Sequence, residues 1–168
     1  MTDINFQKQY KELFLPLGMY ALRLVGNTDV AQDLVQSAFE AAWLKVSEIQ
    51  SLKPYMYRAV HNAALLWLKE NDRMIALDES MDKPISDEDV DRSERDAKLW
   101  RAIDRLPERC REIFLMNKRD GMTYAEIAEE LNISVKTVDN QITKALRTLR
   151  NSSDLQHLQN FMVLLSFF

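Results

Sequence analysis

The pattern that most constrains the fold lies in residues 121–150, where two amphipathic segments are separated by a short turn. The first segment begins Thr123-Tyr-Ala-Glu126. This is the arrangement of a capping box, in which the threonine and glutamate side chains each accept a hydrogen bond from a free N–H at the start of a helix. Asn132 tolerates a left-handed backbone, and Ser134 can cap a second helix that begins at about Val135. The pattern predicts a helix-turn-helix.

Each of the two predicted helices has a distinct apolar side. In the first helix, small or aliphatic residues can pack closely against the second: Ala125, Ile127, Ala128 and Leu131. At 3.6 residues per turn, the second helix has an apolar stripe formed by Val138, Ile142, Ala145 and Leu149. Its opposite face is basic and polar, with Lys136, Asn140, Thr143, Lys144 and Arg147. Lysine and arginine bind phosphates and guanine edges, and asparagine binds adenine edges. This favours a DNA-reading helix over an ordinary amphipathic helix with a solvated charged face.

Composition excludes several classes of protein. Only three glycines occur in 168 residues, so neither a P-loop nor a dinucleotide-binding fingerprint can be assembled. The two histidines and the single cysteine are too scattered for the familiar zinc spacings. No leader peptide is recognisable, and no apolar run approaches the about 20 residues of a membrane span. We expect a cytoplasmic, non-enzymatic protein without metal, cofactor, small-molecule substrate or membrane insertion.

The acidic charge is concentrated in one segment. The chain has a net charge of −4, yet residues 72–96 hold ten acidic and four basic side chains, whereas residues 97–150 hold eleven basic and eight acidic ones. The acidic segment contains Pro84 and lacks sustained apolar periodicity, which predicts a flexible linker. Affinity for DNA rises with the number of phosphates that a protein neutralises. We therefore expect weak DNA binding by the chain alone, and a partner that supplies positive surface.

Residues 1–71 are predicted to form a small helical domain. Aromatic residues recur at helical spacing up to Pro16, which is expected to start a second helix or to kink a longer one. A turn at residues 26–29, capped by Thr28 or Asp29, precedes a helix over about residues 30–46. Its predicted core face is Val30, Leu34, Ala38, Ala41 and Ala42. Its remaining surface carries Asp33, Gln36, Phe39, Glu40 and Trp43, which either complete a small core or form a docking face for another protein.

A further helix is predicted from Pro54 to about residue 70. Its inward face is expected to contain Met56, Ala59, Val60, Ala63, Leu66 and Trp67. The other side gathers Tyr55, Arg58, His61 and Asn62. Aromatic, arginine and asparagine side chains can hold unpaired bases by stacking and hydrogen bonding. A solvated helix face is the alternative for these residues.

Four motifs in this order resemble a known family. They are residues 33–39 (DLVQSAF), the Tyr-Arg-x-x-x-Asn pattern of residues 57–62, residues 106–114 (LPERCREIF) and residues 121–128 (GMTYAEIA). Over about residues 5–150 the chain resembles the two-domain extracytoplasmic-function group of sigma factors of bacterial RNA polymerase. The resemblance implies an all-α protein with two small helical domains, residues 1–71 and 97–150, joined by an acidic linker over residues 72–96. The second domain carries the helix-turn-helix.

The resemblance also implies a role for each motif. The first domain is expected to dock on core RNA polymerase through Asp33, Gln36, Phe39, Glu40 and Trp43. The promoter −10 element is expected to contact Ser51, Lys53, Tyr57, Arg58, His61 and Asn62. The second domain is expected to read the −35 element with Lys136, Thr137, Asn140, Thr143, Lys144 and Arg147. Expected partners are core RNA polymerase, promoter DNA and an anti-sigma factor. The resemblance thus implies that the chain is the specificity subunit that directs transcription initiation.

Some residues depart from the family's pattern or lie outside it. Asp139 stands where many relatives have arginine, so the −35 sequence that is read can differ. His61 and residues 65–66 are also atypical, which leaves the −10 preference open. The tail of residues 151–168 ends in an eight-residue apolar run, too short to span a membrane. We favour a tail that caps the core over one that binds a regulator.

Two other functions fit the same residues. A one-component helix-turn-helix regulator would use residues 1–71 for dimerisation or sensing and would bind a palindrome without polymerase. The low positive charge disfavours this interpretation. A helical adaptor would use both domains for protein contacts only. Replacement of Asn140 and Lys144 would then leave its function unchanged.

Overall fold

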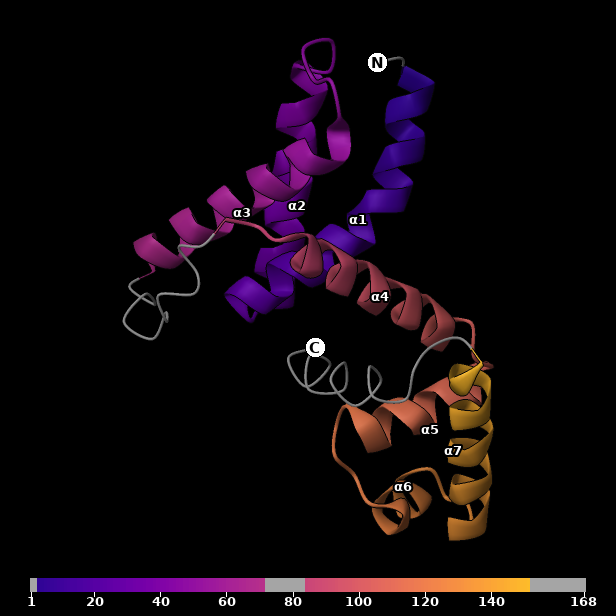
Figure 1. Cartoon of the computed structure of the whole chain (residues 1–168). Helices are drawn as coiled ribbons and strands as arrows, with labels where there is room; N and C mark the ends of the chain where they lie inside the picture. Colours follow the sequence, from indigo (N-terminus) through magenta and orange to yellow (C-terminus); the bar gives the residue numbers. More distant parts are fainter. Residues whose placement is uncertain (1–2, 72–83, 152–168) are drawn as a thin grey trace. The chain divides into compact units, whose positions relative to one another are not determined.

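The computed structural model describes residues 3–71 and 84–151, in which every regular element is a helix (Figure 1). The helices are α1 (Asp3–Val25), α2 (Thr28–Leu44), α3 (Leu52–Glu70), α4 (Asp87–Asp104), α5 (Glu108–Lys118), α6 (Tyr124–Glu130) and α7 (Val135–Arg150). The chain divides into two compact units, of which the first ends at Glu94 and the second begins at Arg95. The prediction of an all-α fold is confirmed. Most of the predicted tail, residues 152–168, lies outside the described residues.

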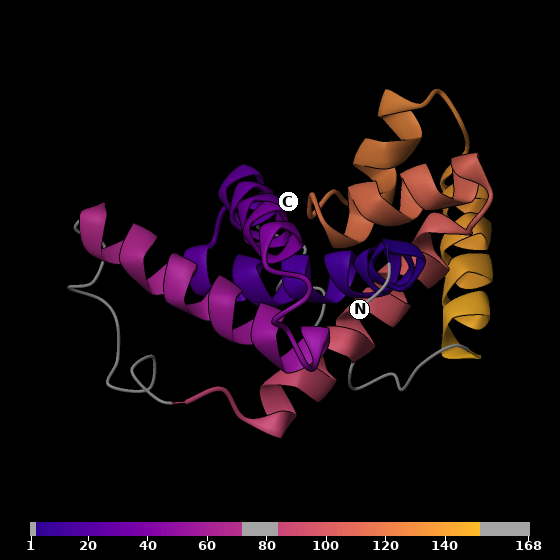
Figure 2. The ribbon, with the colours of Figure 1, turned by 90° about the horizontal axis from the view of Figure 1, so that it is seen from above.

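In the first unit, α1, α2 and α3 pack against one another, as the views in Figure 1 and Figure 2 both show. The helix α1 continues through Pro16, which is buried, so no second helix starts there. The centre of the unit is apolar, and its fully buried side chains include Leu17, Ala21, Val35, Ala42, Met56, Val60 and Ala64. This core fixes which faces of α2 and α3 remain available for partners.

The predicted cap of α2 was wrong, and its predicted core face was partly wrong: Ala38 and Ala42 are buried as expected, whereas Val30, Leu34 and Ala41 are not. Gly26 adopts a left-handed backbone with φ of 65°, and Asn27 follows in an extended conformation and caps the helix by accepting a hydrogen bond from the Val30 N–H at 3.0 Å. The helix therefore begins earlier than expected. Its buried face is Ala31, Val35, Ala38, Phe39 and Ala42.

The predicted core face of α3 was partly wrong. Met56 and Val60 are buried as expected, whereas Leu66 is exposed. The buried face also includes Leu52, Tyr57, Ala64 and Leu68. Pro54 lies in the first turn of α3, where its missing N–H leaves no hydrogen bond unmade.

In the second unit, α7 packs against α5 and α6. The helix-turn-helix has the predicted caps: Thr123 and Glu126 form both halves of the capping box, and the Ser134 side chain accepts a hydrogen bond from the Thr137 N–H at 3.0 Å. Asn132 is left-handed, with φ of 50°. The apolar stripe of α7 is buried as predicted, at Val138, Ile142, Ala145 and Leu149. Of the packing residues expected in α6, Ile127 and Ala128 are buried, but Ala125 is exposed.

The helix α4 begins inside the segment that the sequence assigned to the linker, so residues 87–96 are helical. Ser86 caps it: its hydroxyl accepts from the Asp89 N–H at 3.2 Å, and the Asp89 carboxylate accepts from the Ser86 N–H at 3.0 Å. Acidic residues in the first turn also interact favourably with the helix dipole. Periodicity missed this helix because two of its buried positions are polar, Ser93 and Asp96. The earlier part of the predicted linker, residues 72–83, lies outside the described residues.

Candidate nucleic-acid and docking interfaces

The outer face of α7 presents basic and polar side chains to solvent. The six residues predicted there are all exposed: Lys136, Thr137, Asn140, Thr143, Lys144 and Arg147. Among the described residues, the side chains of Lys136, Asn140 and Lys144 form no hydrogen bond or ion pair. They are therefore available to base edges and phosphates.

Two further residues of α7 modify this face. The Thr137 hydroxyl lies 2.8 Å from that of Ser134, so the Thr137 side chain also takes part in capping the N-terminus of α7. Asp139 is exposed beside Asn140. A carboxylate at this position can accept a hydrogen bond from the amino group of cytosine and repels phosphate. The face therefore combines cationic, amide and carboxylate groups within a few turns.

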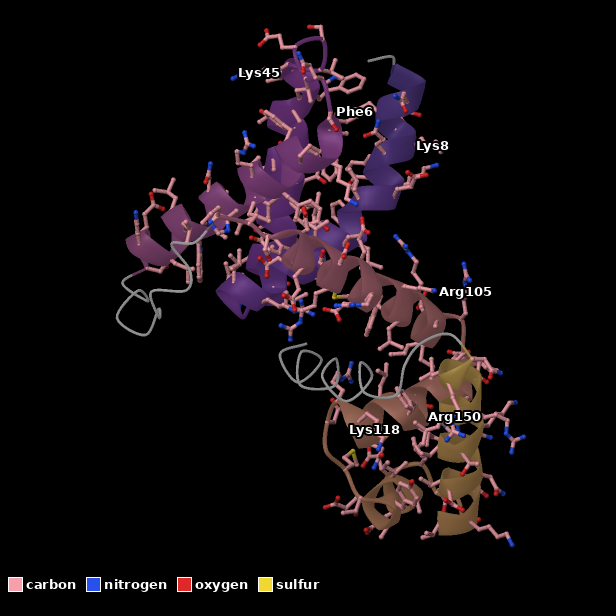
Figure 3. All side chains as sticks on the ribbon, in the orientation of Figure 1. Phe6, Lys8, Lys45, Arg105, Lys118 and Arg150 are labelled. Atoms are coloured by element: carbon pink, nitrogen blue, oxygen red, sulfur yellow. The ribbon has the colours of Figure 1, made fainter. Side chains whose placement is uncertain are left out.

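The predicted docking residues of α2 divide between the core and an exposed groove. Phe39 is only 2% exposed, and its ring contacts those of Tyr10 and Phe6 at centroid distances of 4.6 and 6.1 Å. Trp43 is 42% exposed, and its ring lies 4.9 Å from that of Phe6, which is labelled in Figure 3. Phe39 is a core residue that supports the groove, whereas Trp43 leaves part of its ring exposed to solvent.

Helices α1 and α2 line this groove together. Its lining is almost entirely apolar apart from Gln36 and Glu40: Phe6, Tyr10, Gln36, Phe39, Glu40, Trp43 and Leu44. The Gln36 side chain accepts from the Tyr10 hydroxyl at 3.1 Å and donates to Glu40 at 3.0 Å, which fixes its orientation at the rim. Asp33 is exposed on the same helix. Sequence reasoning missed Leu44, which is 84% exposed, although it directly follows Trp43 in an apolar pair.

The residues predicted to bind the −10 element lie on α3 in different environments. Arg58 and Asn62 are exposed, and His61 is half-buried with its Nδ1 2.8 Å from the Tyr20 hydroxyl. Tyr57 is 2% exposed, and burial raises the pKa of its hydroxyl to about 12. In this conformation Tyr57 is therefore not available for stacking on a base.

Two of the residues predicted to bind the −10 element, Ser51 and Lys53, lie at the start of α3. Ser51 precedes α3 and is exposed, with no side-chain hydrogen bond to cap the helix. Lys53 forms an ion pair with Glu94, with 2.5 Å between Nζ and Oε1. A pocket on this face is shared by two segments and is lined by Pro54, Tyr57, Arg58, His61, Asn62, Leu65, Pro84, Ile85, Ser86, Asp87 and Val90. The sequence analysis did not include residues 84–90 in this site because it assigned them to the linker.

Other kinds of site are not seen in the part of the chain that the structure describes. Within it, no three histidine, cysteine, aspartate or glutamate side chains are grouped so that they could hold a metal ion. Over the same ranges, no helix combines the length and apolar character needed to cross a membrane. Cys110 is buried, with its Sγ 3.4 Å from the Gln141 carbonyl, and burial raises the pKa of its thiol.

Comparison with known proteins matches both units. Residues 16–74 match the family model described as Sigma-70 region 2, and residues 96–149 match the one described as Sigma-70, region 4. RNA polymerase sigma factor SigV of Bacillus subtilis is 26% identical over 133 residues, which cover 77% of this chain and 80% of SigV.

Two longer relatives match a similar share of the chain. The probable RNA polymerase sigma factor RfaY of Xanthomonas campestris pv. campestris is 25% identical over 84% of this chain and 38% of its own length. The ECF RNA polymerase sigma factor SigE of Mycolicibacterium smegmatis is 29% identical over 78% of this chain and 54% of its own length. The chain thus spans about 38% and 54% of these two relatives. With region 2 and region 4 in order on an all-helical fold, the chain belongs to the extracytoplasmic-function group of the sigma-70 family of RNA polymerase sigma factors.

Proposed function

We propose that this chain is a sigma factor that binds core RNA polymerase and directs promoter recognition and transcription initiation in the cytoplasm. The observation that carries the proposal is the outer face of α7. There, exposed Lys136, Asn140 and Lys144 lie opposite a buried apolar stripe, in a unit that matches Sigma-70 region 4. In this role the chain supplies specificity, and the core enzyme performs the chemistry of RNA synthesis.

The proposal assigns a task to each surface. The outer face of α7 reads the −35 element, and the exposed face of α3 with Arg58, His61 and Asn62 holds the −10 strand. The groove between α1 and α2 binds core polymerase through Trp43 and Leu44, since exposed apolar side chains beside a polar rim are typical of protein interfaces. An anti-sigma factor would regulate the chain by covering one of these surfaces.

Gel filtration with purified core polymerase tests the docking step. We expect the chain to co-elute with the core enzyme, and the Trp43→Ala, Leu44→Ala double variant to lose most of this co-elution while keeping its helical circular dichroism. Ile133→Ala serves as a control outside the groove, because Ile133 is a half-buried residue of the second unit. Failure of the wild-type chain to co-elute would contradict the proposal. Tight, specific binding of a palindrome by the chain alone would instead support a one-component regulator.

A further inference from the structure

The first half of α4 is attached to the face of α3 that we propose to hold the −10 strand. The hydroxyl groups of Tyr57 and Ser93 lie 2.5 Å apart, and Ser93 is completely buried. The Ser93 hydroxyl also lies 2.8 Å from the carbonyl of Val90. The next residue, Glu94, pairs with Lys53. Adjacent residues of α4 therefore hold the two ends of one helical turn of α3, residues 53 and 57.

The same segment places negative charge where the proposed function places DNA. Asp87 and Val90 share a pocket with Arg58, His61 and Asn62. Burial raises the pKa of Tyr57 to about 12, the Ser93 hydrogen bond opposes this rise, and the negative charges of Glu94 and Asp91 add to it. These carboxylates therefore lie close to the α3 face. A DNA strand approaching it would meet like charge and an engaged Lys53.

We propose that residues 87–94, called the clasp, cover the −10 face of α3 in the free chain and are released when the chain binds core polymerase and promoter DNA. This inference rests on the proposed function. The occupant that displaces the clasp is the DNA strand, whose phosphates take the place of the Glu94 carboxylate at Lys53. The clasp keeps the free chain from binding single strands.

Zero-length cross-linking tests the release directly. A carbodiimide joins an amine to a carboxylate in contact, so it should couple Lys53 to Glu94 in the free chain, and mass spectrometry can quantify the product. Lys53→Arg should abolish the product while leaving the ion pair possible. In the complex with core polymerase and promoter DNA, we expect the yield to fall at least fivefold. An unchanged yield in that complex overturns the clasp but not the proposed function.

Binding of a fluorescein-labelled, mixed-sequence 12-nucleotide DNA strand by the free chain supplies a second test. Ser93→Ala with Glu94→Gln removes both attachments, and we expect binding about five- to tenfold tighter than wild type. Glu88→Gln is the matched control, because it removes the same charge from the same helix at an exposed position. We expect it to change binding less than about twofold.

Each outcome of the strand-binding measurement either supports or overturns the clasp. Equal effects of the two variants would attribute the change to net charge and overturn the clasp, as would no effect of the double variant. If circular dichroism shows that the double variant is unfolded, Glu94→Gln alone should still tighten binding about threefold, and its failure to exceed Glu88→Gln overturns the proposal. If the chain does not co-elute with core polymerase, the proposed function fails and this measurement alone judges the clasp.

Discussion

Asn140 and Arg147 lie two turns apart on the outer face of α7 and are both exposed. We propose that their chemistry and position give them different tasks. Asn140 has the amide geometry that matches an adenine edge. Arg147 lies further from the N-terminal end of α7, the end that usually enters the major groove, so it is placed for phosphate contact.

Replacement of these residues should separate reading from positioning. We expect Asn140→Ala to cost about 1–3 kcal/mol on the preferred −35 sequence and to relax the preference at one base pair. Arg147→Ala should weaken all promoters alike and reduce the salt slope by about one. Transcription from a library of −35 variants measures both effects. A change in base preference caused by Arg147→Ala alone would mean that α7 is docked differently in the groove.

On the docking face, the burial of a residue decides whether its replacement lowers the stability of the chain or its affinity for core polymerase. Phe39→Ala removes a ring that is packed among other aromatic rings, so we expect the free energy of unfolding to fall by about 3–5 kcal/mol. Trp43→Ala removes a ring that is partly exposed, so it should reduce stability less than Phe39→Ala does, and it should weaken association with core polymerase by about 2 kcal/mol or more. Urea unfolding and gel filtration separate the two effects. A stable Phe39→Ala variant would contradict the core assignment.

At the scale of the element, the parts predicted well were those specified by local signals. The helix-turn-helix follows from its caps and the left-handed Asn132, all of which act within a few residues. The cap of α2 was misplaced because Asn27, Thr28 and Asp29 are all good caps and only the turn at Gly26 selects among them. The helix α4 was missed because Ser93 is buried through a long-range hydrogen bond with Tyr57, which no local pattern reveals.

The capping box of α6 predicts a pH dependence. Hydrogen bonds from the Thr123 backbone and side chain lower the pKa of Glu126. Because the folded-state pKa lies below the unfolded value, this stabilisation is present above the unfolded pKa and is lost as the pH falls through the folded one. Thermal unfolding followed by circular dichroism should show a smaller loss of stability on acidification in Glu126→Gln than in the wild-type chain. Identical pH profiles would refute the contribution of this carboxylate.

For the whole molecule, the distribution of charge predicts dependence on a partner. The chain has a net charge of −4, so it can neutralise few phosphates. We expect the free chain to bind duplex promoter DNA more weakly than about micromolar at physiological salt, while its complex with core polymerase binds tightly. Fluorescence anisotropy with a labelled promoter duplex measures both. Nanomolar, sequence-specific binding by the free chain would support the one-component regulator instead.

The sequence could predict the class and order of the units, because each contains motifs specified over short distances. It could not predict which aromatic residues face a partner, since the burial of Phe39 and Tyr57 depends on α1 and α4, which are distant in sequence. The apolar groove with Leu44 was likewise visible only after α1 and α2 were brought together.

Reconstituted transcription is the most direct measurement of the central claim. Core polymerase is incubated with fragmented genomic DNA from the source organism, with and without the chain, and the 5′ ends of the RNA products are sequenced. We predict new, discrete start sites that depend on the chain, share −35 and −10 elements, and disappear with the Asn140→Ala, Lys144→Ala double variant. The absence of any new start site in the presence of a folded chain that co-elutes with core polymerase would contradict the account.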